Sequence, residues 1–121
     1  MPIFVVHKHH ASHLHWDLRL EMDGVLRSWA VPKEPSTNTS VKRLAVAVDD
    51  HPLSYADFEG EIPGGSYGAG KVIIWDRGKY EMIDKKDGKF VFEMKGEKLK
   101  GKYCLIKLKD GKNWLFFRMN G

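Results

Sequence analysis

The most regular pattern in the chain is an alternation of apolar and polar residues over residues 14–21. Leucine and tryptophan occupy the even positions, whereas His15, Asp17, Arg19 and Glu21 occupy the odd ones. A period of two places these sets on opposite faces, so we predict a half-buried β-strand. Turn residues at 22–24 and an apolar run at 25–31 predict its hairpin partner.

Short apolar, β-branched runs continue through the rest of the chain. They predict further strands over residues 3–7, 44–48, 72–75, 79–83, 89–94, 102–108 and 114–118. A short helix is predicted over residues 54–58, and the glycine-rich segment 58–70 is expected to be an ordered loop without regular structure. Strands spaced by about 8–12 residues predict an all-β sandwich or barrel.

Composition fits one small domain spanning residues 1–121. The length leaves little room for two domains, and 42% hydrophobic residues are enough for one core. The net charge of +4, from 20 basic and 16 acidic residues, is compatible with a polyanionic partner. A basic surface on an ordinary domain explains this charge equally well.

Cysteine content and hydropathy exclude several classes of protein. Cys104 is the only cysteine, so no intramolecular disulfide and no cysteine-rich zinc site can form. No apolar run approaches the roughly 20 residues that span a bilayer. The apolar stretch at the N-terminus is too short for a signal peptide. We therefore expect a soluble, cytoplasmic protein without a membrane partner.

Histidines gather around the alternating strand and suggest a metal site. Successive side chains on one face of a strand are about 6.6–7 Å apart, so His15, Asp17 and Arg19 project together. Two imidazoles and a carboxylate suit a first-row metal, and His9 lies just before the strand, where the chain can curl back. Arg19 offers a planar fork for phosphate. The alternative is that this polar face is merely the solvent-exposed face.

Two further segments are candidates for binding. His51 follows a predicted strand end, and Tyr55 lies close enough in sequence to approach the same ligand. The alternative for residues 49–52 is a capped turn, which aspartate and proline favour for structural reasons. Backbone N–H groups of the glycine-rich loop could contact phosphate, but a tight structural crossover is the better interpretation.

Long motifs of the chain resemble a known family. The runs KHHASHLHWDLRLEMDGVLRSWAVPK, KRLAVAVDDHPLSYADFEGEIP and GSYGAGKVIIWDRG are similar to the 3′-phosphoesterase domain of bacterial ligase D, also found free-standing in archaea and bacteria. The resemblance extends over residues 3–118. It implies a small closed β-barrel of about eight mostly antiparallel strands with short helical segments. It also implies Mn²⁺-dependent removal of a terminal 3′ ribonucleoside and then of the 3′-phosphate. The sequence leaves open whether Zn²⁺, Co²⁺ or another divalent metal takes the place of Mn²⁺.

The resemblance also implies roles for individual residues. Metal binding falls on His9, His15 and Asp17, and contacts with the scissile phosphate fall on the catalytic residues Arg19, His51 and Tyr55. Lys33 and Arg43 are expected along the groove, with His7 and Asp49 as further substrate-binding positions. His7 and Asp49 stand where glutamine and glutamate are common, and His10 and His13, in place of aspartate and arginine, have no assigned role.

The expected partner is the 3′ end of a DNA or RNA primer-template, together with separate ligase, polymerase or Ku-type end-joining proteins. The sequence begins about where the barrel begins, so without the N-terminal arm of the bacterial domains we expect ribonucleoside removal to be the weaker step. Two other functions stay open at this point. One is a nucleic-acid-binding module with little turnover, and the other is a cupin-like metalloenzyme acting on small molecules.

Overall fold

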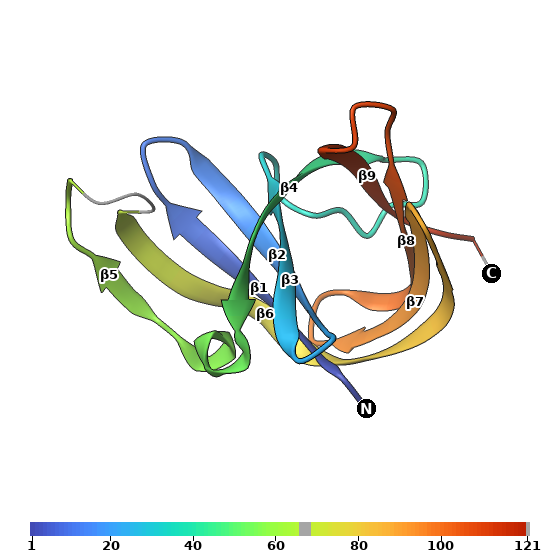
Figure 1. Cartoon of the computed structure of the whole chain (residues 1–121), viewed down its shortest axis with the longest axis horizontal. Helices are drawn as coiled ribbons and strands as arrows, with labels where there is room; N and C mark the ends of the chain where they lie inside the picture. The colour runs from blue at the N-terminus through green and yellow to red at the C-terminus, as the bar shows by residue number, and fades with distance from the viewer. Residues whose placement is uncertain (66–68, 121) are drawn as a thin grey trace.

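The chain forms a twisted antiparallel sheet that closes into a barrel (Figure 1). The structure is a computed structural model that describes residues 1–65 and 69–120. Its elements are β1 (Ile3–His10), β2 (Leu14–Met22), β3 (Val25–Val31), β4 (Arg43–Pro52), the 3-10 helix η1 (Leu53–Asp57), β5 (Gly60–Ile62), β6 (Gly70–Lys86), β7 (Lys89–Gly96), β8 (Lys100–Lys107) and β9 (Asn113–Arg118). Within these residues, no helix could span a membrane.

Strand pairing explains how the barrel closes. The order is β1-β2-β3-β4-β9-β8-β7-β6-β5, and a further pairing of β1 with β6 joins the sheet into a ring. All of these pairs are antiparallel. The ring contains eight strands, while β5 adds to β6 outside it. This confirms the predicted all-β fold with a closed barrel and a short helical segment.

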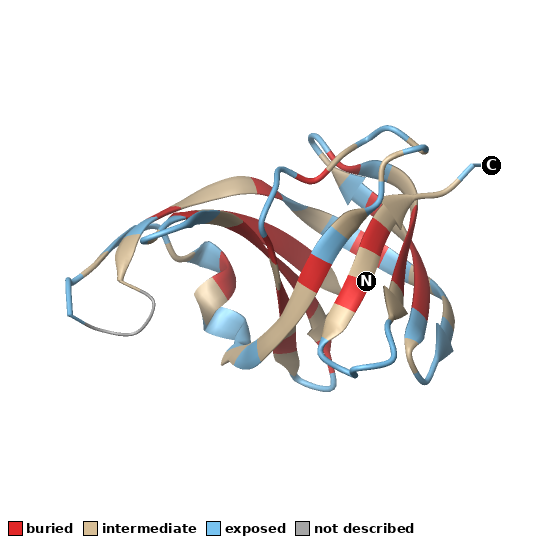
Figure 2. Cartoon of the chain, turned by 90° about the horizontal axis from the view of Figure 1, so that it is seen from above, coloured by how far each residue is buried: buried red, intermediate tan, exposed pale blue. Residues whose placement is uncertain are grey.

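The barrel interior is filled by the apolar positions of the alternating strands. In β2, Trp16, Leu18 and Leu20 point inward and are at most 8% exposed. Trp29 from β3 is fully buried and packs edge-on against Trp114 from β9. Burial is therefore concentrated on the strands that form the ring (Figure 2). Because the inward face is occupied by the core, the polar face of β2 has to point away from the barrel.

The longest strand corrects one prediction. Residues 72–75 and 79–83 were expected as separate strands, but both belong to β6, which has 17 residues. The interruption at Asp76 and Gly78 resembles a turn in sequence only. Gly78 is extended and pairs with Gly96 on β7, and only glycine fits there because a Cβ would lie 2.2 Å from the carbonyl oxygen of Lys95. This close approach keeps β6 continuous, so that its first part pairs with β5 and its second part with β7.

Asp76 is a structural residue, and its replacement by alanine is expected to destabilise the protein. Its buried carboxylate accepts hydrogen bonds from the backbone N–H groups of residues 97–99 in the β7–β8 turn. Losing these acceptors should lower the free energy of unfolding by about 3 kcal/mol. Asp84→Ala, which removes a surface ion pair with Lys86, should change it by less than about 1 kcal/mol. Urea unfolding would measure both, and equal midpoints would contradict this role.

The segment between β4 and β6 corrects two further predictions and shapes the outer face. The strand predicted over residues 44–48 continues to Pro52, and His51 and Pro52 pair with β3, so the alternative of a capped turn at residues 49–52 is wrong. The glycine-rich segment is not entirely a loop, because β5 pairs with β6; its residues 66–68 lie outside the described ranges. Helix η1 agrees with the predicted short helix and packs Ala56 against Val5 and Leu26. These elements cover part of the outward face of β1, β2 and β3.

Candidate metal and phosphate site

The β1–β2 hairpin brings the candidate ligands together. Its register places His9 opposite His15, and His7 opposite Asp17. Arg19 follows on the same outward face, opposite Val5. We expected His9 in a loop before the strand, but it lies within β1, so that direct cross-strand pairing, rather than a curled loop, brings it to His15.

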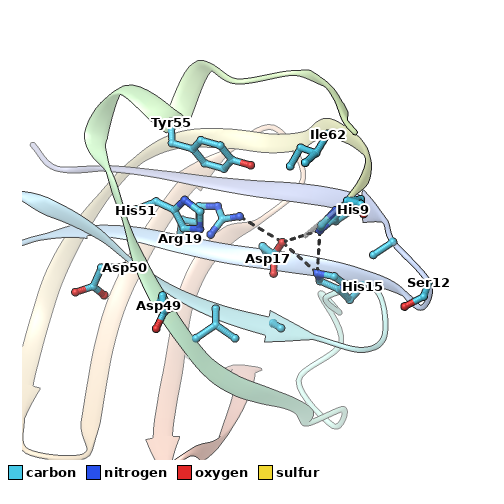
Figure 3. Close-up of a pocket in the computed structure, with 14 residues that line it drawn as sticks. His9, Ser12, His15, Asp17, Arg19, Asp49, Asp50, His51, Tyr55 and Ile62 are labelled. Carbon is cyan, nitrogen blue, oxygen red and sulfur yellow. Dashed lines mark hydrogen bonds and ion pairs between the residues drawn. The ribbon is translucent and has the colours of Figure 1, made fainter. Parts of the chain in front are cut away.

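Three ligand atoms converge on this face. One ligand atom each of His9, His15 and Asp17 lies within 4.8 Å of the others. Asp17 Oδ2 is 3.2 Å from His15 Nε2 and 3.7 Å from His9 Nδ1, and these two nitrogens are 3.2 Å apart (Figure 3). The Asp17 carboxylate and the His9 ring are almost fully buried, whereas the His15 ring is partly exposed. The cluster is thus accessible from one side.

Backbone carbonyl groups determine how the two imidazoles are protonated. His9 Nε2 lies 3.1 Å from the carbonyl oxygen of Ala69, and His15 Nδ1 lies 3.0 Å from that of His13. A carbonyl oxygen only accepts hydrogen bonds, so each of these ring nitrogens carries the proton. His15 Nε2 donates a hydrogen bond to Asp17 Oδ2. A bound metal would take the place of that proton, so that His15 Nε2 and His9 Nδ1 would present lone pairs to it. Outer hydrogen bonds of this kind orient histidines that bind metals.

The charges around Asp17 favour its ionised form. Burial alone would raise the pKa of Asp17, but the hydrogen bond from His15 and the nearby Arg19 charge outweigh it, and the pKa is lowered. The same hydrogen bond raises the pKa of His15 above its ordinary value. A carboxylate and two nitrogen lone pairs match the donor set of a first-row divalent metal. These residues therefore fit the metal that the resemblance implies.

Arg19 is held from three directions beside this cluster. Its Nε donates to His7 Nδ1 at 3.0 Å, one terminal nitrogen donates to Ser28 Oγ at 2.9 Å, and the other lies 3.3 Å from Asp17 Oδ2. The guanidinium has five N–H groups, and these contacts use three of them. One N–H on each terminal nitrogen is left, among the residues described, to bind the oxygens of an anion.

His7 supports Arg19 without reaching the groove. Its ring is fully buried, accepts the Arg19 Nε hydrogen bond at Nδ1, and donates from Nε2 to the carbonyl oxygen of Phe58. Burial, and then the Arg19 charge, lower the pKa of His7 to about 4. A neutral imidazole is the form that can accept from a guanidinium. The structure thus places His7 behind Arg19, rather than where it would contact a substrate directly.

His51 and Tyr55 form the opposite wall of the site. Their rings stack with centroids 4.4 Å apart, and Tyr55 stacks in turn on Phe58 at 5.0 Å. Arg19 lies 5.0 Å from the centre of the Tyr55 ring. Burial, with a further contribution from Arg19, lowers the pKa of His51. A neutral His51 can donate one N–H to an anion that also reaches Arg19.

The groove between these walls has a volume of about 780 Å³. Seven predicted site residues line it: His9, His15, Asp17, Arg19, Asp49, His51 and Tyr55. Lys33 and Arg43 do not line it, and the Arg43 Nε donates to the carbonyl oxygen of Glu34 instead. Ser28 was missed, although the hairpin register places it directly opposite Arg19. Asp50 and Ala69 were missed as well, and only the tertiary structure identifies them.

Comparisons with known proteins show the family of this chain. The profile of the family described as "DNA Ligase D 3′-phosphoesterase domain" matches residues 7–107. The "Multifunctional non-homologous end joining protein LigD" of Pseudomonas aeruginosa is 56% identical over 109 residues, which cover 86% of this chain. Proteins of the same name from Mycobacterium bovis and Mycolicibacterium smegmatis are 51% and 50% identical over 96% of this chain.

The matched relatives are much longer than this chain. The aligned regions make up 13% of the Pseudomonas protein and 16% of each of the other two. The likeness is therefore to a small part of each of these longer proteins. Since the profile matches most of the residues and at least half of the aligned positions are identical, the chain belongs to the 3′-phosphoesterase domain family of DNA ligase D.

Proposed function

We propose that this chain is an Mn²⁺-dependent phosphoesterase that heals nucleic-acid 3′ ends. It would remove a 3′-phosphate from a primer-template and, as a second activity, a terminal 3′ ribonucleoside. Family membership supports end processing as the general role. The relatives are named for non-homologous end joining, so a ligase, polymerase or Ku-type protein would act on the same end.

One observation carries this proposal. His9 Nδ1 and His15 Nε2 converge on Asp17 Oδ2, and the free N–H groups of Arg19 lie beside the same carboxylate. A cation site next to an anion site, in one open groove, suits a phosphate ester. A divalent metal bound there would polarise the phosphate and lower the pKa of a water ligand. A purely structural polar face would not need the two histidines oriented in this way.

The protein residues would each make a different contact with the phosphate. Arg19 would bind two phosphate oxygens through its remaining N–H groups and stabilise the charge that develops in the transition state. His51 would donate a hydrogen bond to a third oxygen, and Tyr55 would hold His51 in place by stacking. Among the described residues that line the groove, Ser12 is the only serine or cysteine, and it is exposed at the rim of the groove. We therefore propose direct attack by water.

Removal of metal is expected to abolish this activity reversibly. After treatment with a chelator, the protein should release no phosphate from a 3′-phosphorylated primer-template, and Mn²⁺ should restore release. A dye assay for free phosphate measures this. A binding module would instead show salt-sensitive DNA affinity without phosphate release. A cupin-like enzyme would show no preference for polynucleotide ends, and either result would overturn the proposal.

A further inference from the structure

A second pocket lies at one end of the barrel, away from the groove. It has a volume of about 310 Å³, and its main lining residues are Arg27, Lys85, Lys86, Phe90, Lys107 and Trp114. Phe90 and Trp114 belong to the barrel core, whereas Lys85 and Lys86 precede the β6–β7 turn. We refer to this basic opening of the barrel, defined by the six residues above, as the barrel mouth.

The Arg27 guanidinium makes cation–π contacts with two aromatic rings at the barrel mouth. Its guanidinium carbon lies 5.2 Å from the Trp29 ring centre and 5.4 Å from that of Phe90. Within residues 1–65 and 69–120, Arg27 makes no side-chain hydrogen bond and no ion pair. Stacking uses the flat faces of a guanidinium and leaves its N–H edges available. The rings thus hold a cation whose donors are unused.

The neighbouring lysines add positive charge to the same opening. Four cationic residues line the pocket, against the single carboxylate of Asp87. Lys107 lies 3.5 Å from Asp87, and Lys85 and Lys86 lie 3.8 and 3.6 Å from Asp23 and Asp84. These pairs are exposed, at distances where such contacts contribute little. An anion could therefore replace them at small cost.

The chemistry of the barrel mouth selects phosphate. Phe90 and Trp114 are only 4% and 3% exposed, so they offer no surface on which a base could stack. A planar fork with lysines around it is the arrangement that binds phosphate oxygens. The acidic and histidine side chains of the groove are absent from the described lining of this pocket. It is therefore an anion site without the means for catalysis.

The two sites lie on opposite faces of one strand. Arg27 and Ser28 are neighbours in β3; Arg27 points toward the barrel mouth, and Ser28 faces outward to hold Arg19. We infer that the barrel mouth binds a backbone phosphate of the same nucleic acid whose 3′ end occupies the groove. This inference rests on the proposed function and extends it, because it adds a contact that carries no sequence information but positions the substrate.

Paired variants test this inference. The double variant Lys85→Gln/Lys86→Gln should raise KM for a long 3′-phosphorylated duplex about tenfold and leave kcat unchanged. The slope of log affinity against log salt concentration should fall in magnitude by about one for each phosphate contact that is lost. A 3′-phosphorylated dinucleotide, too short to reach the barrel mouth, should be unaffected. Lys95→Gln with Lys100→Gln removes the same charge at the β7–β8 hairpin and should change neither substrate. Equal KM values for all three proteins would overturn the inference.

A direct measurement separates failure here from failure of the proposed function. On titration with a 3′-hydroxyl duplex, the indole N–H signals of Trp29 and Trp114 should shift, while that of Trp75 serves as the reference. Arg27→Met should abolish the shifts while the protein remains folded; if it unfolds, the lysine pair gives the same comparison. Unmoved Trp29 and Trp114 signals on DNA binding would overturn the inference. Absence of phosphate release by the unmodified protein would overturn only the proposed function.

Discussion

Replacement of Asp17 by alanine should eliminate Mn²⁺-dependent phosphate release. We expect a loss of at least about 10³-fold, beyond the roughly 10–100-fold that removal of an outer-sphere partner costs. Asp17 is the only anionic member of the cluster, and its Oδ2 atom faces His9, His15 and Arg19 together. Without it, two neutral imidazoles would have to hold a divalent cation beside a guanidinium. Calorimetric titration with Mn²⁺ should show the loss of binding directly.

The same change also affects stability, so the experiment needs a gentler variant. Arg19 is only 4% exposed, and removing its carboxylate partner should destabilise the fold by about 3 kcal/mol. Asp17→Asn keeps the shape and an oxygen acceptor but loses the charge. It should remain folded with activity near that of Asp17→Ala. Asp57→Ala, which removes an exposed carboxylate paired with Arg77, is the matched control and should retain full activity. Near-normal turnover by folded Asp17→Asn would contradict the metal assignment.

Local periodicity predicted much of the fold and the centre of the site. Alternation in β2 places His15, Asp17 and Arg19 on one face, and the structure has them there. The same reasoning, extended to the preceding strand, would also have placed His7 and His9 opposite Asp17 and His15. The sequence pattern predicts that strand only as far as residue 7, because the histidines that follow are neither β-branched nor apolar. The register of the β1–β2 hairpin thus predicts more residues of this site than the pattern of either strand alone.

Features that depend on tertiary contacts could not be predicted from the sequence. Aspartate and proline at residues 49–52 favour a turn, yet these residues continue β4, and His51 and Pro52 pair with β3. β5 forms because Gly60 and Ile62 find partners on β6, which no local pattern indicates. Lys33 and Arg43, expected along the groove, do not line it. Their place depends on the path of the β3–β4 connection, which sequence alone does not determine.

Arg19→Lys is expected to slow turnover by about 10²–10³-fold at saturating Mn²⁺ and substrate, the range found when one preorganised donor to a developing charge is removed. Lysine keeps the positive charge but not the planar fork. It cannot contact His7, Ser28 and Asp17 and still offer two parallel N–H groups to a phosphate. Rapid-quench measurement of a single turnover would separate this chemical step from product release.

The pattern of effects distinguishes phosphate binding from a purely structural role for Arg19. If Arg19 binds phosphate, the lysine variant should bind Mn²⁺ within about tenfold of the normal affinity, because the charge beside Asp17 is preserved. If Arg19 mainly orients Asp17, Mn²⁺ affinity and turnover should fall together. Arg77→Lys changes an exposed arginine that also pairs with a carboxylate, and it should leave both quantities unchanged. Unimpaired single turnover by Arg19→Lys would show that the fork of Arg19 is not needed for the reaction.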